Sequence, residues 1–526
     1  MKSRLVVYPF LIAAFPILGL YAQNAREIPP RELALPLAAA VGATSLAWGA
    51  LRLLLRDAHR AGLIAAMGVA VFATVAAAPG AVAEGLSLLS GLWVGHRYEA
   101  WPATVVGLEL GLFAGLSYLA ARRLKTPDGW TPALNLFATV LVAFPATSIV
   151  RARAGVAARP AQAMPTLASL PTTGRRPDIY YIILDGFARG DVLASTFGYD
   201  LEPFLRRLEG RGFYVPRRST ANYCQTPLSI ASSLNGAYHE PATSETNAGM
   251  PPDPVLFRHN AVVASLAPLG YRFVTFSSGF DFTEYPGADV YLSPYFHLTD
   301  FQRMLAEGTP LAGLLPGLID RDSYTMTRER TLYLFDHLPD VARIAGPTFT
   351  FAHVLSPHPP FTFGPDGEDV SPHHKPYFLS DGSVYRGAYG DAASYVGGYR
   401  KQVAFLVKRV EATIDRILAE SPEPPIIVLQ SDHGSGLNLD MESAQRTDHA
   451  ERMSILNAYY LPGGGREGLH DRITPVNSFR AVFRNEFGAR LDPLPEENYY
   501  STWSQPFGFV RVTDRVDAPR VPARAE

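Results

Sequence analysis

The chain has 526 residues, a formal net charge of −2 and one cysteine, Cys224. The near-neutral charge argues against a nucleic-acid partner held by general electrostatics, and a lone cysteine excludes an internal disulfide and a cysteine-cluster metal site. The length is sufficient for two or three domains. Residues 1–150 contain long apolar stretches with few charges, whereas the remainder has the mixed composition of a globular domain.

Five apolar segments in the first 150 residues approach or exceed the roughly 20 residues that a bilayer core requires. They are 5–22, 33–55, 61–83, 102–121 and 131–150. We therefore predict a transmembrane helical domain over residues 1–150. The first segment could be a signal peptide, but it has no convincing small-residue cleavage site, and the four further apolar segments predict membrane anchoring in either case.

Basic residues are concentrated at the ends and loops on one side of these segments: Lys2, Arg4, Arg52, Arg56, Arg60, Arg122, Arg123 and Lys125. Because positive charge favours the cytoplasmic side, this bias predicts a multi-pass protein of the inner or plasma membrane. The chain after residue 150 is then extracytoplasmic, which means periplasmic in a cell with two membranes. Arg151, Arg153 and Arg159 on the outer side run against the bias.

Residues 151–176 are rich in Ala, Pro, Thr and Arg and lack apolar periodicity, which predicts a linker. Beyond it, short β-rich runs alternate with amphipathic stretches. This pattern indicates an α/β domain over 177–510, with a mostly parallel central sheet covered by helices on both sides, and a tail at 511–526.

The clearest helix of this domain is predicted at 396–419, where apolar residues recur at helical spacing. Strands are expected at 179–184, 271–277, 348–355, 425–431 and 455–461. The segments 242–256 and 364–395 are crowded with Gly, Pro, Asp and His and are predicted to be loops.

Two of the predicted strands are followed by residue types that commonly bind metals. Asp185 and Gly186 follow the strand 179–184, and Ser431-Asp432-His433-Gly434 closes the strand 425–431. Parallel sheets gather such strand ends along one edge. A carboxylate oxygen and an imidazole nitrogen side by side suit a divalent cation such as Zn²⁺ or Mn²⁺, so the sequence predicts one metal site at this edge.

Thr226 precedes a proline and a stretch with helical potential that closes at Gly236. The pattern is typical of an N-cap with proline at the first helical position. A hydroxyl there lies at the positive end of the helix dipole, and contact with a divalent cation would make it a plausible nucleophile. Helix capping alone is the alternative interpretation.

Four ordered motifs together resemble the alkaline phosphatase and sulfatase superfamily, and within it the membrane-anchored transferases of the lipoteichoic acid synthase and phosphoethanolamine transferase type. The motifs are Leu184-Asp185-Gly186; Thr226 with the stretch from Ser229 to Tyr238; the stretch from His353 to Phe361; and Ser431-Asp432-His433-Gly434. The similarity spans about 177–480. It implies an alkaline phosphatase/sulfatase-like α/β/α fold for the domain after the linker.

The resemblance implies that Asp185, Thr226, Asp432 and His433 bind one divalent metal ion, Zn²⁺ or Mn²⁺. Sulfatases make their nucleophile from a cysteine, but the alignment of Ser229 to Gly236 places Thr226, and not Cys224, at that position. Ile230 also replaces the arginine of the sulfatase pattern. Both departures favour the phosphotransferase branch, whose nucleophile is a threonine.

The resemblance also implies a catalytic role for His358, which matches the histidine that meets the transferred group or the leaving oxygen. His449 and Asn222 are predicted to contact substrate, with a surface histidine and a turn asparagine as the alternative interpretations. His353 is interpreted as a core histidine or one that supports a ligand. His373 and His374 lie in a predicted loop. They are interpreted either as an adventitious cation site or as residues without a role.

The function implied is a metal-dependent phosphotransferase that moves a phospholipid head-group phosphate, of the phosphoglycerol or phosphoethanolamine type, through a phosphothreonine intermediate. The expected partners are a membrane phospholipid donor, a glycan or lipid acceptor of the cell envelope and the lipid bilayer, with no nucleic acid. The alternatives are a sulfatase-like hydrolase of sulfuric esters or phosphodiesters, and a non-catalytic envelope protein that binds glycans.

Overall fold

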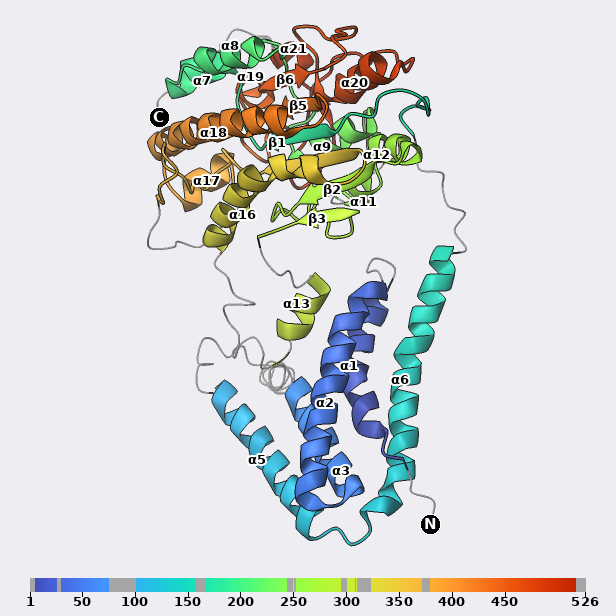
Figure 1. Ribbon diagram of the computed structural model, residues 1–526. Helices are drawn as coiled ribbons and strands as arrows, with labels where there is room; N and C mark the ends of the chain where they lie inside the picture. Colours follow the sequence, from blue (N-terminus) through green and yellow to red (C-terminus); the bar gives the residue numbers. More distant parts are fainter. Residues whose placement is uncertain are drawn as a thin grey trace. The chain divides into compact units, whose positions relative to one another are not determined.

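The computed structural model describes residues 5–25, 30–74, 101–157, 166–243, 249, 252–294, 300–307, 309, 323–370 and 379–516. The chain divides into two compact units (Figure 1). The first comprises Met1–Gln162 and His297–Arg321, and the second comprises Ala163–Phe296 and Asp322–Glu526. The segment 297–321, which the sequence analysis placed inside the α/β domain, thus groups with the helical unit.

The first unit is helical in its described part. Its helices are α1 (Tyr8–Asn24), α2 (Ala34–Leu55), α3 (Ala58–Thr74), α5 (Trp101–Arg122), α6 (Pro127–Ala157) and α13 (Asp300–Glu307). Phe301 of α13 packs edge-on against Tyr21 of α1, with ring centroids 5.8 Å apart, which explains why this later segment joins the unit.

Among the described residues, two helices are long and apolar enough to cross a membrane by length and composition: Ala34–Leu55 and Pro127–Arg151. The prediction of five spans is therefore supported for two. The helices α1 and α3 are apolar but have 17 residues each, short of the roughly 20 that a bilayer core requires. Part of the predicted span 61–83 lies outside the described residues, and α6 continues to Ala157, into the predicted linker.

The second unit is an α/β domain around a six-stranded sheet of order β3-β2-β4-β1-β5-β6. All neighbours are parallel except β5 and β6, which are antiparallel. The strands are β1 (Ile179–Leu184), β2 (Arg272–Phe276), β3 (Val290–Leu292), β4 (Thr348–Val354), β5 (Ile426–Gln430) and β6 (Asn457–Tyr460). The fold class predicted for this domain, with a mostly parallel sheet, is confirmed.

Each strand predicted from the sequence is present, and β3 is an additional edge strand of three residues. A small antiparallel pair, β7 (Tyr499–Tyr500) and β8 (Val510–Arg511), lies outside the main sheet. The chain of this unit continues past the predicted boundary at residue 510, because Val512 and Val516 are buried in a cluster with Cys224 and Met453.

Helices pack on both faces of the sheet. Alternate residues of β1 point to opposite sides, so Tyr180, Ile182 and Leu184 join one apolar cluster while Ile179, Tyr181 and Ile183 join the other. The helices packed in the first cluster are α7 (Gly190–Phe197), α8 (Glu202–Gly210), α16 (Ser323–His337), α17 (Gly382–Ala388) and α18 (Ala392–Glu420). Those of the second are α9 (Thr226–Asn235), α11 (Val255–Arg258), α12 (Ala261–Leu266) and α20 (Ser478–Phe487).

Two short helices complete the described unit: α19 (His449–Met453) and α21 (Thr513–Val516). The predicted helix 396–419 corresponds to α18. The predicted loop 364–395 contains α17 and the start of α18, where Asp391 caps the helix through Ser394. His373 and His374 of that loop lie outside the described residues.

Candidate metal centre and active site

The centre of the sheet brings three strand ends together. β1 lies between β4 and β5, with Ile183 paired in register with His353 on β4 and with Gln430 on β5. Asp185 follows β1 directly, and Asp432 follows β5 two residues after Gln430. Three candidate ligands therefore lie at the carboxyl edge of adjacent parallel strands, where open α/β sheets form their ligand sites.

The turn that carries Asp432 and His433 is fixed by local hydrogen bonds. The Ser431 hydroxyl donates to the Leu184 carbonyl oxygen at 2.8 Å, and the backbone N–H of Gly186 donates to Asp432 Oδ1 at 3.0 Å. Gly434 permits a close approach of the turn to the end of α19, because a Cβ there would lie 2.2 Å from the Glu451 carbonyl oxygen. The turn is thus held between β1 and α19.

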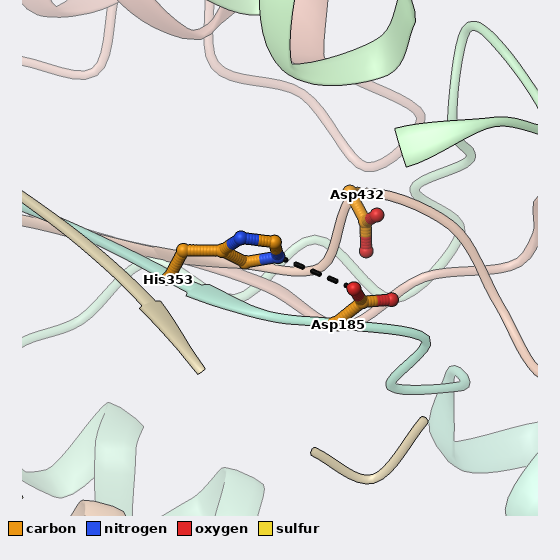
Figure 2. A group of neighbouring side chains, drawn as sticks. All are labelled: Asp185, His353 and Asp432. Atoms are coloured by element: carbon orange, nitrogen blue, oxygen red, sulfur yellow. Dashed lines mark ion pairs between the residues drawn. The ribbon is translucent and has the colours of Figure 1, made fainter. Parts of the chain in front are cut away.

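Asp185, His353 and Asp432 form a buried cluster whose donor atoms all lie within 4.8 Å of one another. Figure 2 shows the three side chains pointing toward one another, with His353 Nε2 3.3 Å from Asp185 Oδ2. Asp185 Oδ1, Asp432 Oδ2 and His353 Nε2 are buried and have no hydrogen-bond partner. Buried polar atoms without partners are costly, so this donor set fits a cation that would ligate them.

His433 and Thr226 extend this cluster. His433 Nε2 lies 3.5 Å from Asp185 Oδ1, 3.3 Å from Asp432 Oδ2 and 3.1 Å from Thr226 Oγ1. The structure therefore brings together all four of the predicted metal-binding residues, Asp185, Thr226, Asp432 and His433. It adds His353 to them.

The tautomer of His433 follows from its partner. His433 Nδ1 lies 3.0 Å from the Gly434 carbonyl oxygen, which can only accept, so the proton is on Nδ1. The Nε2 lone pair of His433 therefore faces the carboxylates, as metal binding requires. His353 Nδ1 lies 2.9 Å from Thr283 Oγ1, and this contact holds the ring with Nε2 toward Asp185.

Burial and neighbouring charges shift the pKa values of the cluster residues. Burial, followed by repulsion from Asp432, raises the pKa of Asp185 well above its usual value. Burial lowers the pKa of His353 to about 4, and burial and the positive charge of Arg452 lower the pKa of His433 well below its usual value. Neutral imidazoles beside two buried carboxylates are the state in which a divalent cation is bound.

Thr226 is the first residue of α9, and Gln225, which caps no backbone N–H with its side chain, precedes it. The prediction that Thr226 caps the helix is therefore wrong. Because its hydroxyl is not used for capping, it is directed to His433 and lies at the positive end of the helix dipole.

His358 lies next to the cluster in the turn after β4. Its backbone N–H donates to the Asp185 carbonyl oxygen at 3.1 Å, and its ring centroid is 6.2 Å from that of His433. The Nδ1–H donates to the Pro359 carbonyl oxygen at 2.6 Å, which leaves Nε2 facing Asp381 Oδ2 at 3.8 Å. The ring is held in place without a close partner on Nε2.

The two residues predicted to contact substrate, Asn222 and His449, have hydrogen-bond partners outside the cluster. The buried Asn222 side chain donates to Tyr238, Thr474 and the Glu497 carbonyl oxygen, and it accepts from Val476 N–H. His449 begins α19, is buried against Tyr500 and bonds the Ala444 carbonyl oxygen through Nε2. Both side chains bond groups of the chain itself, His449 through Nε2 only, and substrate contact stays a prediction for both.

Sequence reasoning underestimated His353 and missed Asp381. His353 lies at the end of a strand that is buried throughout, the same signal that identified Asp185, but it was interpreted as a core histidine or one that supports a ligand. Asp381 lies in a predicted loop, and its buried carboxylate contacts Arg452 and Tyr395, which are distant in sequence. No local pattern indicates contacts of that kind.

We expect His353→Gln to lower zinc affinity by more than the roughly 10- to 100-fold typical for a residue that merely supports a ligand. The physical reason is the loss of the Nε2 lone pair beside Asp185. A competition titration with a chromophoric chelator measures the affinity. His239→Gln is the matched control, because His239 is a half-buried histidine that bonds the Leu228 carbonyl oxygen outside the cluster. Equal affinities in the two variants would show that His353 is not a ligand.

Glu451 gives the unit a pH dependence of stability. Its carboxylate accepts from Ser435 and Asn438, but burial outweighs these bonds and raises its pKa to about 7. Ionisation in the folded state is therefore unfavourable, so stability is full below about pH 4.5 and falls as pH rises to about 7, by roughly 3 kcal/mol.

Thermal unfolding of the full chain in detergent and EDTA, at pH 5 and pH 8, measures this effect. Glu451→Gln is expected to remove most of the loss between the two pH values, whereas Glu467→Gln, at an exposed site, leaves it unchanged. The same pH dependence in Glu451→Gln and wild type would contradict the assignment.

No protein-family model and no curated protein matches this chain. Similar solved structures exist. The C-terminal periplasmic domain of EcEptC from Escherichia coli, in complex with Zn, is 12% identical, with 66% of this chain and 96% of that chain covered and a TM-score of 0.43.

Two further structures represent a membrane transferase and a hydrolase. The integral membrane lipooligosaccharide phosphoethanolamine transferase A (EptA) from Neisseria meningitidis is 11% identical, with 91% of this chain and 94% of that chain covered and a TM-score of 0.38. The phosphonate monoester hydrolase of Agrobacterium radiobacter is 15% identical, with 62% of this chain and 80% of that chain covered and a TM-score of 0.40. Identities and TM-scores this low do not indicate a function, which rests on the site itself.

Proposed function

We propose that the chain is a membrane-anchored, metal-dependent phosphotransferase that acts on phospholipid head groups outside the cytoplasm. The observation that supports this most directly is the placement of the Thr226 hydroxyl, 3.1 Å from His433 Nε2 and beside two buried carboxylates. A scaffold or glycan-binding protein would have no use for four such groups around one point. A threonine at the start of a helix is instead suited to nucleophilic attack.

Asp185, Asp432, His433 and Thr226 would hold the metal ion, with His353 as an additional ligand. A divalent cation bound there supplies positive charge that acidifies the Thr226 hydroxyl and stabilises the oxygens of the phosphoryl group. Two imidazoles together with carboxylates favour zinc over manganese. The test of this assignment is the metal content of the purified protein.

The reaction is proposed in two steps. Thr226 Oγ, after its proton is lost to solvent, attacks the head-group phosphorus, and the bond from phosphorus to the lipid oxygen breaks, which gives a phosphothreonine and a lipid alkoxide. His358, as an imidazolium protonated on both ring nitrogens, gives the alkoxide the Nε2 proton and becomes neutral. An acceptor hydroxyl then attacks the phosphothreonine and passes its proton to His358 Nε2, and the Thr226 oxygen leaves and regains a proton from solvent.

The helical unit supports a lipid donor. The two long apolar helices, the five apolar segments of the sequence and the bias of basic residues to one side fit a multi-pass anchor in the inner membrane. The α/β unit would then face the periplasm, within reach of lipid head groups. We propose a phosphoglycerol or phosphoethanolamine type of group, with a glycan or lipid of the envelope as the acceptor.

The experiment uses the full chain in detergent with a phospholipid labelled in its head-group phosphate, Zn²⁺ or Mn²⁺, and an envelope glycan. The proposed transferase releases diacylglycerol and moves the label to the glycan. Release of the label only as a free head-group phosphate would identify a hydrolase instead. Absence of turnover with either metal and with several head groups would overturn the proposal.

A further inference from the structure

A buried ion pair, Arg452–Asp381, lies next to the metal centre. Neither residue is a proposed metal ligand or reacting group. Arg452, in α19, and Asp381, just before α17, have side chains that are 2% and 3% exposed, and Arg452 Nη1 lies 2.6 Å from Asp381 Oδ2. Ion pairs buried this deeply are costly to form, and replacing them with apolar residues often does not destabilise a protein. A purely stabilising role therefore does not account for this pair.

The guanidinium of Arg452 holds the two chain segments that carry the reacting groups. Nε and Nη2 donate to the Cys224 carbonyl oxygen at 3.0 and 2.8 Å, two residues before Thr226. Nη1 also donates to the Gly434 carbonyl oxygen at 3.3 Å, next to His433. One planar group thus sets the spacing between the threonine and the histidine, whose Oγ1 and Nε2 atoms lie 3.1 Å apart.

Asp381 fixes the direction of this guanidinium. Its Oδ1 accepts from Tyr395 OH at 2.7 Å and from Gly382 N–H at 2.9 Å, so the carboxylate cannot turn away from Arg452. The same Oδ2 that binds Arg452 faces His358 Nε2 at 3.8 Å. The pair therefore contacts all three segments that bear Thr226, His433 and His358.

We infer that the Arg452–Asp381 pair is the positioning element of the metal centre, which holds Thr226 and His433 at the spacing that allows both to bind one cation. The inference deepens the proposed function and rests on its metal centre. Arg452 acts through the backbone carbonyl groups that it binds, and Asp381 acts through Arg452 and through the side of His358 Nε2 that it faces.

The test compares zinc affinity in Arg452→Lys and Asp381→Asn with that of the wild-type full chain. Lysine keeps the charge but lacks the planar fork that serves three acceptors at once. We expect zinc affinity to fall by about 10- to 100-fold in each variant, as for other residues that orient ligands. The rise in Tm on zinc addition should shrink accordingly.

Arg480→Lys is the matched control. Arg480 also uses its guanidinium to hold two backbone carbonyl groups, those of Gly236 and Asp492, and it does so at the opposite end of α9 from Thr226. Its replacement should lower the Tm of the zinc-free and zinc-loaded protein equally and leave zinc affinity unchanged. A purely structural role for Arg452 would give this same result, and zinc affinities within threefold of wild type would overturn the inference.

If one of the two variants fails to fold, the zinc affinity of the other tests the inference. If both fail, Tyr395→Phe is the test, because it removes a hydrogen bond to Asp381 without removing a charge. The readout needs no substrate, so it separates the inference from the proposed function. A wild-type protein that binds zinc but transfers no head group overturns the proposed function alone. A wild-type protein that binds no zinc overturns both.

Discussion

Thr226→Ala is expected to lower turnover of a phospholipid donor by on the order of 10⁴-fold or more, as removal of a nucleophile does in other covalent mechanisms. The hydroxyl lies 3.1 Å from His433 Nε2, and no other described side-chain hydroxyl is hydrogen-bonded to this nitrogen. The covalent phosphate adduct, detected by mass spectrometry of the denatured protein after a rapid quench, should disappear with the activity.

Two variants make this result specific. Thr226→Ser keeps a hydroxyl in the same place and should retain the adduct and much of the activity. Ser232→Ala removes another buried hydroxyl from α9, one that bonds the Ala237 carbonyl oxygen, and should react like the wild type. An adduct that persists in Thr226→Ala, on any residue, would assign the nucleophile elsewhere.

The sequence was sufficient for the part of the site that depends on strand ends. Asp185 and Asp432 each follow a run of apolar residues long enough to be a buried strand, and parallel pairing brings such ends together without further information. The order of motifs along the chain supplied Thr226. These residues were predictable because each lies within a few residues of the element that positions it.

The contributions of Asp381 and Arg452 could not be predicted in the same way. Each depends on a contact between segments 71 residues apart in the sequence, and neither has a periodic pattern around it. Asn222 was predicted to contact substrate because it is a polar residue just before α9. In the fold, contacts from residues more than 250 positions away satisfy its side chain.

The helical unit shows where apolar composition alone misleads. Runs of apolar residues mark helices well, but they set helix length poorly, because a helix can end inside an apolar run and start before it. The helix α1 occupies Tyr8–Asn24 where 5–22 was expected, and α6 continues beyond residue 150 to Ala157. Length and composition together decide whether a helix can span a bilayer, and among the described residues two helices satisfy both, where five spans were expected.

Asp432→Asn is expected to abolish zinc binding and to lower turnover about as strongly as Thr226→Ala. The amide keeps the oxygen that accepts from Gly186 N–H, so the turn after β5 is preserved. It replaces Oδ2, a buried oxygen without a hydrogen-bond partner that lies 3.3 Å from His433 Nε2, with an uncharged NH₂ group that cannot bind a cation.

The stability of this variant should change in opposite directions with and without metal. Without metal, the charge of Asp432 adds to the cost of ionising the buried Asp185, so removal of that charge should raise the Tm in EDTA or leave it unchanged. With zinc, the wild type gains the free energy of binding to the folded state, about 2.7 kcal/mol at a zinc concentration of 100 times Kd, and the variant gains none.

Asp289→Asn is the control for these measurements, because the Asp289 carboxylate also accepts a backbone N–H, that of Phe273, but lies outside the cluster. It should keep both the zinc-induced rise in Tm and the turnover. A metal-free Tm that falls in Asp432→Asn, together with unchanged zinc affinity, would mean that Asp432 serves only to hold the turn. The cluster would then lack the second carboxylate on which cation binding depends.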